Sequence, residues 1–165
     1  MKTRSSRVAL ALPTTPALLL GTPAWAVAMA ASAAVWLALG DRLSTSRTGA
    51  ILLVFAVGGA LAFPVALYVT RLVAPPGHRE RRFAAAFAAF GLCSVLGVAF
   101  VFSMQYRIYY AQWHEPFPSV VWAFQFVFTG AAAVYQFAVL GARMFFPAGL
   151  IALFLVSLWQ ARQVR

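Results

Sequence analysis

Acidic side chains are scarce in this chain of 165 residues. Asp41, Glu80 and Glu115 are its three carboxylates, against 13 lysines and arginines, and charged residues make up 10% of the sequence. Because soluble domains carry roughly a quarter charged residues, this composition excludes a soluble globular domain. Proton relays within membranes generally need an acid inside a span, and no long apolar segment contains one. The sequence therefore argues against proton-coupled or sodium-coupled transport.

Metal-ligating and nucleophilic motifs are also missing. The single cysteine, Cys93, excludes an internal disulfide and a CxxC pair. His114 and Glu115 fall short of the three or four protein ligands of a zinc site, and His78 is expected on the opposite side of the membrane. There is no Walker loop, no HExxH and no histidine pair spaced for haem. We therefore expect no metal, no cofactor, no catalytic residue and no enzymatic activity.

Apolar residues are abundant instead. They make up 63% of the chain, and the mean hydropathy is +0.84. The sequence predicts a single all-α membrane domain over residues 1–165, a polytopic bundle of five transmembrane helices. The expected helices are 23–40, 49–70, 83–104 (or as far as 112), 118–140 and 147–160. The expected connections are a basic N-terminal segment at 1–22, a cytoplasmic basic loop at 71–82 and an outer aromatic loop at 105–117.

The start of the first helix is predicted from Thr22 and Pro23, an N-cap residue followed by proline at the first helical position. The residues Ala24-Trp25-Ala26 resemble a signal-peptide cleavage site. Cleavage after Ala26 would leave a segment too short to span a bilayer before Gly40. We therefore expect this segment to be retained.

The number of spans has two interpretations. Residues 119–160 as one helix would be about 63 Å long, roughly twice the hydrocarbon thickness, so the chain must turn back near 141–147. Residues 144–159 are apolar on every side, which favours a fifth span. The alternative is four spans plus an interfacial C-terminal helix. That arrangement would place ten basic residues inside and three outside, compared with eight and five for five spans.

Basic residues flank the apolar segments, as the positive-inside rule and contact with anionic headgroups produce. This pattern predicts a bacterial-type inner (plasma) membrane with the N-terminus in the cytoplasm. Membrane lipids are the expected partners, together with a protein partner in a membrane complex or a second copy of the chain. The positive charge does not indicate nucleic acid, because it lies at the ends of membrane segments.

Two strips of small residues are candidates for helix packing, since helices in lipid associate through close contact of small side chains. Gly58, Ala62 and Ala66 recur at intervals of four in the second helix. A second strip occupies the third helix. Its members are Ala84, Ala88, Gly91 and Val95.

A polar stripe runs along the fourth helix. Gln125, Thr129, Gln136 and Arg143 lie within roughly 40° of one another at about 100° per residue. Because unpaired polar groups in hydrocarbon are costly, the stripe should face the bundle or a wet cavity. It either forms interhelical hydrogen bonds or lines a substrate cavity. In both cases Gln125→Leu and Gln136→Leu should weaken assembly or activity, whereas apolar exchanges at Val127 should not.

An aromatic segment at residues 106–118 lies where the third predicted helix gives way to the outer loop. Tyrosine and tryptophan concentrate at membrane boundaries, so it is either an outer aromatic belt or the wall of a pocket. We expect Glu115 to neutralise Arg107 or His114. If the segment forms a pocket with the polar stripe, the candidate ligand-binding residues are Arg107, Tyr109, Tyr110, Trp113, His114, Glu115, Trp122, Gln125, Thr129 and Gln136.

Two functions are compatible with this pattern. The first is a non-enzymatic accessory or assembly subunit of a membrane complex, favoured by the packing strips and by the missing catalytic groups. The alternative is a small-molecule or lipid binding or transport protein. It would use a cavity between the outer aromatic loop and the polar face of the fourth helix.

Overall fold

The computed structural model describes residues 11–74 and 78–163, and within these ranges it is helical with no strand. Long runs of apolar residues form helices because a helix satisfies its own backbone hydrogen bonds where water is absent. The elements are α2 (Thr15–Leu39), α3 (Thr48–Val73), α4 (Arg79–Tyr110), the short helix η1 (Ala111–Trp113), α5 (Val120–Gln136), the π-helical turn η2 (Phe137–Gly141), η3 (Ala142–Phe145) and α6 (Ala148–Arg162).

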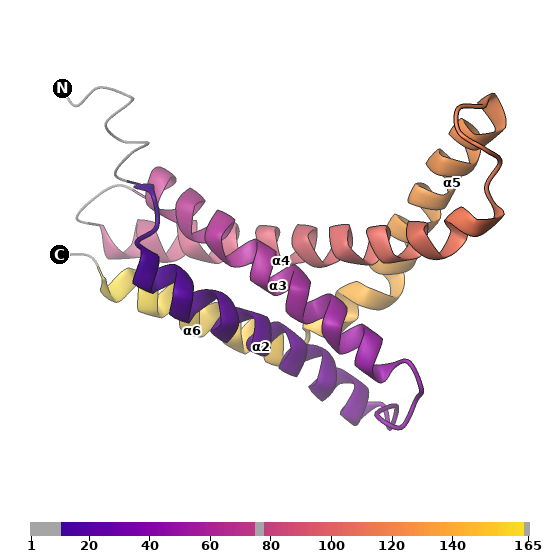
Figure 1. Cartoon of the computed structure of the whole chain (residues 1–165). Coiled ribbons are helices and arrows are strands. Elements are labelled where there is room, and N and C mark those ends of the chain that lie inside the picture. The colour runs from indigo at the N-terminus through magenta and orange to yellow at the C-terminus, as the bar shows by residue number, and fades with distance from the viewer. Residues whose placement is uncertain (1–10, 75–77, 164–165) are drawn as a thin grey trace.

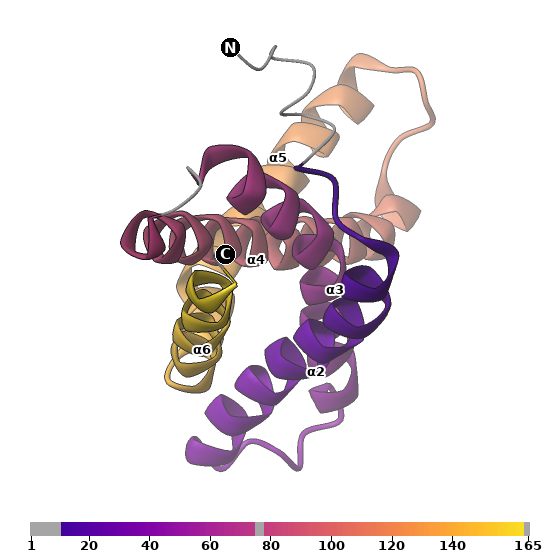
Figure 2. The same cartoon turned by 90° about the vertical axis from the view of Figure 1, so that its left-hand side faces the viewer.

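Helices α2, α3, α4 and α6 form a bundle (Figures 1 and 2). The first three run antiparallel in chain order, and α6 returns along the first half of α4 and beside α2. The start of α2, the end of α3, the start of α4 and the end of α6 all lie at one end of this bundle (Figure 1). Arg71 near the end of α3 donates to the Leu12 carbonyl at 2.9 Å, which joins two of these segments.

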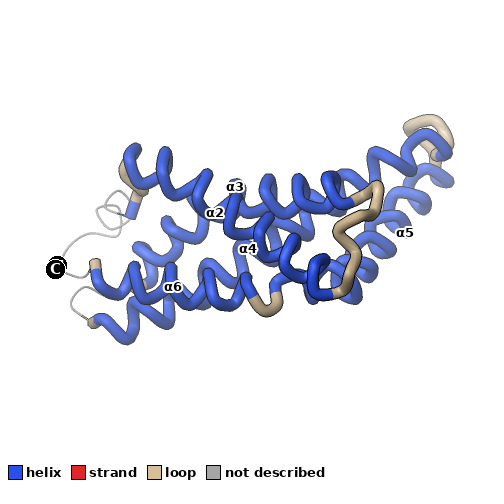
Figure 3. Tube along the Cα trace, turned by 90° about the horizontal axis from the view of Figure 1, so that it is seen from below, coloured by secondary structure: helices blue, strands red, loops and turns tan. Residues whose placement is uncertain are grey.

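Helix α5 diverges from the bundle (Figures 1 and 3). It packs on the second half of α4, and its one buried residue is Ala133. By length and composition, four helical segments could cross a membrane: α2, α3, α4 with η1, and α5 with η2 and η3. The 15 residues of α6 form a shorter apolar helix.

The closest packing joins α3 to α4 through glycine. A Cβ added to Gly58 would lie 2.5 Å from the Val98 Cα, and one added to Gly97 would lie 2.6 Å from the Gly58 carbonyl oxygen. Ala62 and Ala66 are buried on the same face of α3. The predicted packing strip on the second apolar run is therefore confirmed.

The predicted strip on the third run is wrong within this chain. Ala84, Ala88 and Val95 are exposed, and of the four predicted members only Gly91 is partly buried, beside Leu153 of α6. The buried face of α4 instead carries two other alanines together with larger or polar side chains. Its members are Ala86, Ala89, Phe90, Ser94 and Val98. In an alanine-rich helix small residues occur at intervals of four on several faces, so their spacing does not identify the packed one.

Two buried hydrogen bonds join α2 to its neighbours. Trp25 Nε1 donates to Ser94 Oγ of α4 at 2.9 Å, and Ser32 Oγ donates to the Met144 carbonyl of η3 at 2.7 Å. The Trp25 ring meets Phe90 edge-on at 5.2 Å between centroids, and Phe90 has no exposed surface. The core of the bundle therefore combines aromatic packing with paired polar groups.

Several helix limits differ from the predicted ones. Helix α2 begins at Thr15, with Pro16 in its first turn, and Pro23 lies inside it. Proline has no backbone N–H to donate, and this loss is tolerated where neighbouring helices pack around the freed carbonyl. Helix α4 and η1 extend to Trp113, which corresponds to the longer of the two predicted limits. The expected aromatic loop is therefore largely helical, and the link to α5 is residues 114–119.

The remaining predicted segments are divided differently. The expected basic loop at 71–82 begins in the last turn of α3 and ends in the first turn of α4. The predicted helix 118–140 consists of α5 and most of η2, and the chain turns back before α6. Residues 1–10, which hold Lys2, Arg4 and Arg7, lie outside the described residues, as do 75–77 and 164–165.

Candidate ligand-binding pocket

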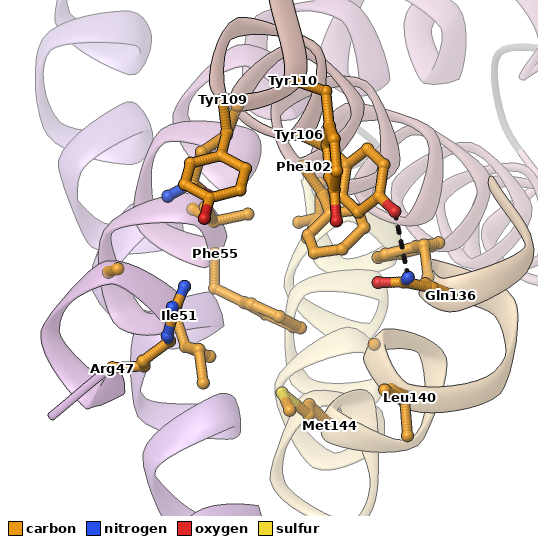
Figure 4. Close-up of a pocket in the computed structure, with 16 residues that line it drawn as sticks. Arg47, Ile51, Phe55, Phe102, Tyr106, Tyr109, Tyr110, Gln136, Leu140 and Met144 are labelled. Carbon is orange, nitrogen blue, oxygen red and sulfur yellow. Dashed lines mark hydrogen bonds between the residues drawn. The ribbon is translucent and has the colours of Figure 1, made fainter. Parts of the chain in front are cut away.

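A pocket of about 480 Å³ lies between the start of α3, the second half of α4 and the turns η2 and η3 (Figure 4). Helix α4 extends past the start of α3, so its second half can face both the start of α3 and the turns η2 and η3. The lining residues are Arg47, Ala50, Ile51, Val54, Phe55, Val98, Phe102, Gln105, Tyr106, Tyr109, Tyr110, Gln136, Phe137, Leu140, Gly141 and Met144.

The pocket has an apolar floor and a polar rim. Phe55, Val98 and Phe137 are buried and belong to the hydrophobic core. Tyr109 and Tyr110, by contrast, are exposed. The other polar lining groups are Arg47, Gln105, Tyr106 and Gln136. This gradient suits a ligand that has both a hydrocarbon part and a polar part.

One wall of the pocket is held by a hydrogen bond between α4 and α5. Gln136 Nε2 donates to the Tyr106 hydroxyl oxygen at 3.2 Å (Figure 4). The Tyr106 ring packs against Tyr110 at 4.5 Å and against Phe102 at 6.1 Å between centroids. The three rings follow one face of α4, since they are four residues apart. The last residue of α5 is thus tied to a row of aromatic rings.

Arg47 is the one charged residue of the lining, and sequence reasoning did not single it out. It immediately precedes α3, between the predicted helices 23–40 and 49–70. No motif marks it. The available signal was its place at the start of an apolar run, on the same expected side of the membrane as the aromatic segment.

Two predicted site residues of α5 hold the 114–119 link rather than the pocket. The Thr129 hydroxyl is 3.1 Å from His114 Nε2, and Gln125 Oε1 accepts from the Glu115 backbone N–H at 2.8 Å. Gln125 and Thr129 therefore face the link, and Gln136 faces α4. For Gln125 and Thr129 these contacts correspond to the hydrogen-bonding interpretation of the stripe. Arg143 is exposed and does not line the pocket.

The expected neutralisation of Arg107 or His114 by Glu115 has no counterpart among the contacts of the described residues. The Arg107 guanidinium carbon instead lies 3.5 Å from the centroid of the Phe126 ring. A guanidinium over an aromatic face is attracted by the ring quadrupole, which favours this arrangement beside α5.

The predicted tryptophans join aromatic clusters outside the pocket. Trp122 lies between Phe117, at 4.8 Å, and Phe126, at 5.1 Å, measured between ring centroids. Trp113 contacts Tyr109 at 5.3 Å. Clusters of this kind are typical of a membrane boundary.

Of the ten predicted ligand-binding residues, the structure brings Tyr109, Tyr110 and Gln136 together around one cavity. The other seven surround the link between α4 and α5 or flank it. They are Arg107, Trp113, His114, Glu115, Trp122, Gln125 and Thr129.

Metal-binding geometry is not present in the part of the chain that the structure describes, where no three His, Cys, Asp or Glu side chains are grouped to hold an ion. The pocket lining itself consists of apolar residues, tyrosines, glutamines and one arginine. Comparison of the chain with protein-family models, curated proteins and solved structures found no match in any of the three. Its function is therefore inferred from the pocket and from the arrangement of the helices.

Proposed function

We propose that this protein is a non-enzymatic multi-pass membrane protein that binds an amphiphilic small molecule or lipid. The observation that supports this proposal is the pocket of about 480 Å³ with a buried apolar floor and a tyrosine-rich rim. Its volume lies within the range of roughly 300–1,000 Å³ that is common for small-molecule sites. The lining has no carboxylate, histidine, serine or cysteine, so it offers no acid–base pair or activated nucleophile.

For the membrane arrangement we propose four crossings, by α2, α3, α4 and α6, rather than five. Both ends of the described chain lie at the same end of the bundle, which requires an even number of crossings (Figure 1). Helix α6 is short, but its buried residues pack in the bundle, and η3 extends the returning segment. In this arrangement α5 lies at the outer boundary, beside the end of the bundle that holds Arg47.

The distribution of charge supports a cytoplasmic location for the terminal end of the bundle. Five arginines of the described chain occur at that end: Arg71, Arg79, Arg81, Arg82 and Arg162. In sequence Lys2, Arg4 and Arg7 precede α2, and they lie outside the described residues. The positive-inside rule then places the N-terminus in the cytoplasm, as in a bacterial-type inner membrane.

Reporter fusions test this arrangement. A fluorescent protein that folds only in the cytoplasm should be active at both termini, whereas a fusion within the α2–α3 connection at residues 40–47 should be inactive. Five crossings would instead give an active N-terminal fusion and an inactive C-terminal one.

Ligand binding is tested by occlusion of the pocket. Ile51→Trp places a large ring at the pocket, whereas Leu53→Trp makes a similar change on the exposed, non-lining side of the same helix. Protein purified in a mild neutral detergent should carry a defined lipid, detected by native mass spectrometry. We expect Ile51→Trp to lose this lipid and Leu53→Trp to retain it. Equal retention by both variants would contradict the proposal.

A role as an accessory subunit is the second candidate, and α5 is the observation that favours it. Val120, Phe124, Val127 and Phe128 are all more than half exposed on a helix that stands apart from the bundle. A photo-crosslinker at Phe128 should give a discrete adduct with one protein, whereas a crosslinker at Leu53 of α3 should give lipid adducts. Lipid adducts alone at both positions would contradict this role.

A further inference from the structure

We infer that the pocket selects amphiphiles with an anionic head group, which Arg47 and the tyrosine hydroxyls hold at the rim while the hydrocarbon part contacts the floor. This inference rests on the proposed binding function and adds the charge of the ligand to it. The lining contains one charged side chain, and that charge is positive.

The backbone around Arg47 is held by its own segment. The Thr48 hydroxyl donates to the Leu43 carbonyl at 3.0 Å and lies 3.0 Å from the Thr45 hydroxyl. The Thr48 backbone N–H donates to the Thr45 carbonyl at 3.1 Å, and the Arg47 carbonyl accepts the Ile51 N–H at 3.1 Å. Arg47 is therefore presented from a bonded turn, which reduces the backbone conformational entropy lost when its side chain binds an anion.

The start of α3 adds to the positive potential of Arg47. The first amides of a helix have no partner within the helix, and the helix dipole is positive at this end. The first turn of α3 contains no acidic residue, and no N-cap side chain accepts from its amides. Ala50, in this turn, lines the pocket. The positive end of the helix and the Arg47 guanidinium thus act on the same cavity.

The tyrosines supply further donors. Arg47 extends toward Tyr109 in Figure 4, and Tyr109 and Tyr110 belong to the same rim. The Tyr106 hydroxyl oxygen accepts from Gln136, and each rim tyrosine hydroxyl carries one proton that it can donate. An anionic oxygen is the acceptor that would pair best with a guanidinium and phenolic hydroxyls together.

The floor defines the rest of the ligand. Phe55, Val98 and Phe137 are buried, and Met144 is buried beside them. These apolar side chains offer a surface against which the hydrocarbon part of a ligand can pack. A carboxylate on a fatty chain and a phosphate on a lipid share the required chemistry, an anionic head on an apolar body.

Paired amphiphiles test this inference on the full chain in neutral detergent. Oleate and oleyl alcohol differ in the head group and share one chain, and phosphatidic acid and diacylglycerol form a second pair. In a pair that binds, we expect the affinity of the charged member to be about tenfold or more higher than that of its neutral partner. Hydrogen bonds to charged groups supply a difference in affinity of this size. A preference in the oleate pair alone indicates a free fatty acid, whereas one in the phosphatidic acid pair alone indicates a lipid headgroup.

Arg47→Gln should remove this preference, and Arg47→Lys should largely retain it. Arg42→Gln is the matched control, because Arg42 belongs to the same α2–α3 connection but does not line the pocket. Its guanidinium carbon lies 5.9 Å from the centroid of the Trp36 ring. Equal affinity for charged and neutral amphiphiles in the wild type, or an equal loss with Arg42→Gln, would overturn the inference and leave pocket binding intact. Failure of every amphiphile to bind would overturn both proposals.

Discussion

Gln136 and Tyr106 are hydrogen-bonded at 3.2 Å between the last residue of α5 and the second half of α4. They lie 30 positions apart in sequence, and both line the pocket. The bond occurs where α5 gives way to the π-helical turn η2. Such turns are frequent at functional sites, and here the turn directs Phe137 into the core while Gln136 remains at the pocket wall.

Gln136→Leu should therefore loosen α5 on α4. Hydrogen bonds between membrane helices average about 0.6 kcal/mol, with a maximum near 1.7, so we expect a loss of stability within that range. Reversible unfolding in mixed micelles measures it. Tyr106→Phe should cost a similar amount, and the double variant should cost less than the sum of the two.

Val127→Leu provides the control for that series, because Val127 is 63% exposed on α5 and is not a member of the polar stripe. Its unfolding should match that of the wild type. If Gln136→Leu behaved like Val127→Leu, the hydrogen bond would have no role in holding the pocket wall.

Gln125→Leu should free the Glu115 amide. Its acceptor is Gln125 Oε1 at 2.8 Å, and a backbone N–H without a protected partner exchanges faster. Hydrogen–deuterium exchange should accelerate at residues 114–119 and remain unchanged in α3. Phe124→Leu, at the exposed neighbouring position, should leave the exchange of this link as it is in the wild type.

Gly58→Ala should separate α3 from α4. The new Cβ would lie 2.5 Å from the Val98 Cα, a backbone atom that cannot rotate away, and overpacking of this kind costs about 1–3 kcal/mol. A Cβ added to Gly49, which belongs to the same helix, would meet nothing within 4 Å. Gly49→Ala should therefore be neutral or stabilise the protein by up to about 1 kcal/mol. Thermal unfolding in detergent compares the two. An equally stable Gly58→Ala variant would show that these helices do not approach so closely.

Ser94→Ala should leave the Trp25 indole N–H without its acceptor in the core. We expect a cost of about 1 kcal/mol, because an unpaired buried donor keeps its desolvation penalty. Ser103→Ala removes the same atom from the same helix away from Trp25 and serves as control. Trp25 fluorescence, recorded in a background where the other four tryptophans are replaced by phenylalanine, should shift with Ser94→Ala alone.

The apolar runs predicted the helices better than the motifs predicted their ends. Helix α3 begins at Thr48, one residue before the expected start at 49. The prediction was close because the helix begins where the uncharged run begins. Pro23 was misleading as a start signal, because proline is tolerated inside a packed membrane helix. The hydrogen-bonding interpretation of the polar stripe agrees with the contacts of Gln125, Thr129 and Gln136, since half-buried polar groups on one helix face find partners on the segments beside it.

Sequence alone determined that most of this chain is apolar helix, because in hydrocarbon the backbone must satisfy its own hydrogen bonds within each segment. Only the tertiary structure decided that Arg47 and Tyr109 line one pocket, that α6 rather than α5 packs in the bundle, and which face of α4 is buried. Lipid is as apolar as the side chains it surrounds, so helix association depends on the fit of shapes. That fit joins residues far apart in sequence, such as Gly58 and Val98, and the spacing of residues within one helix does not record it.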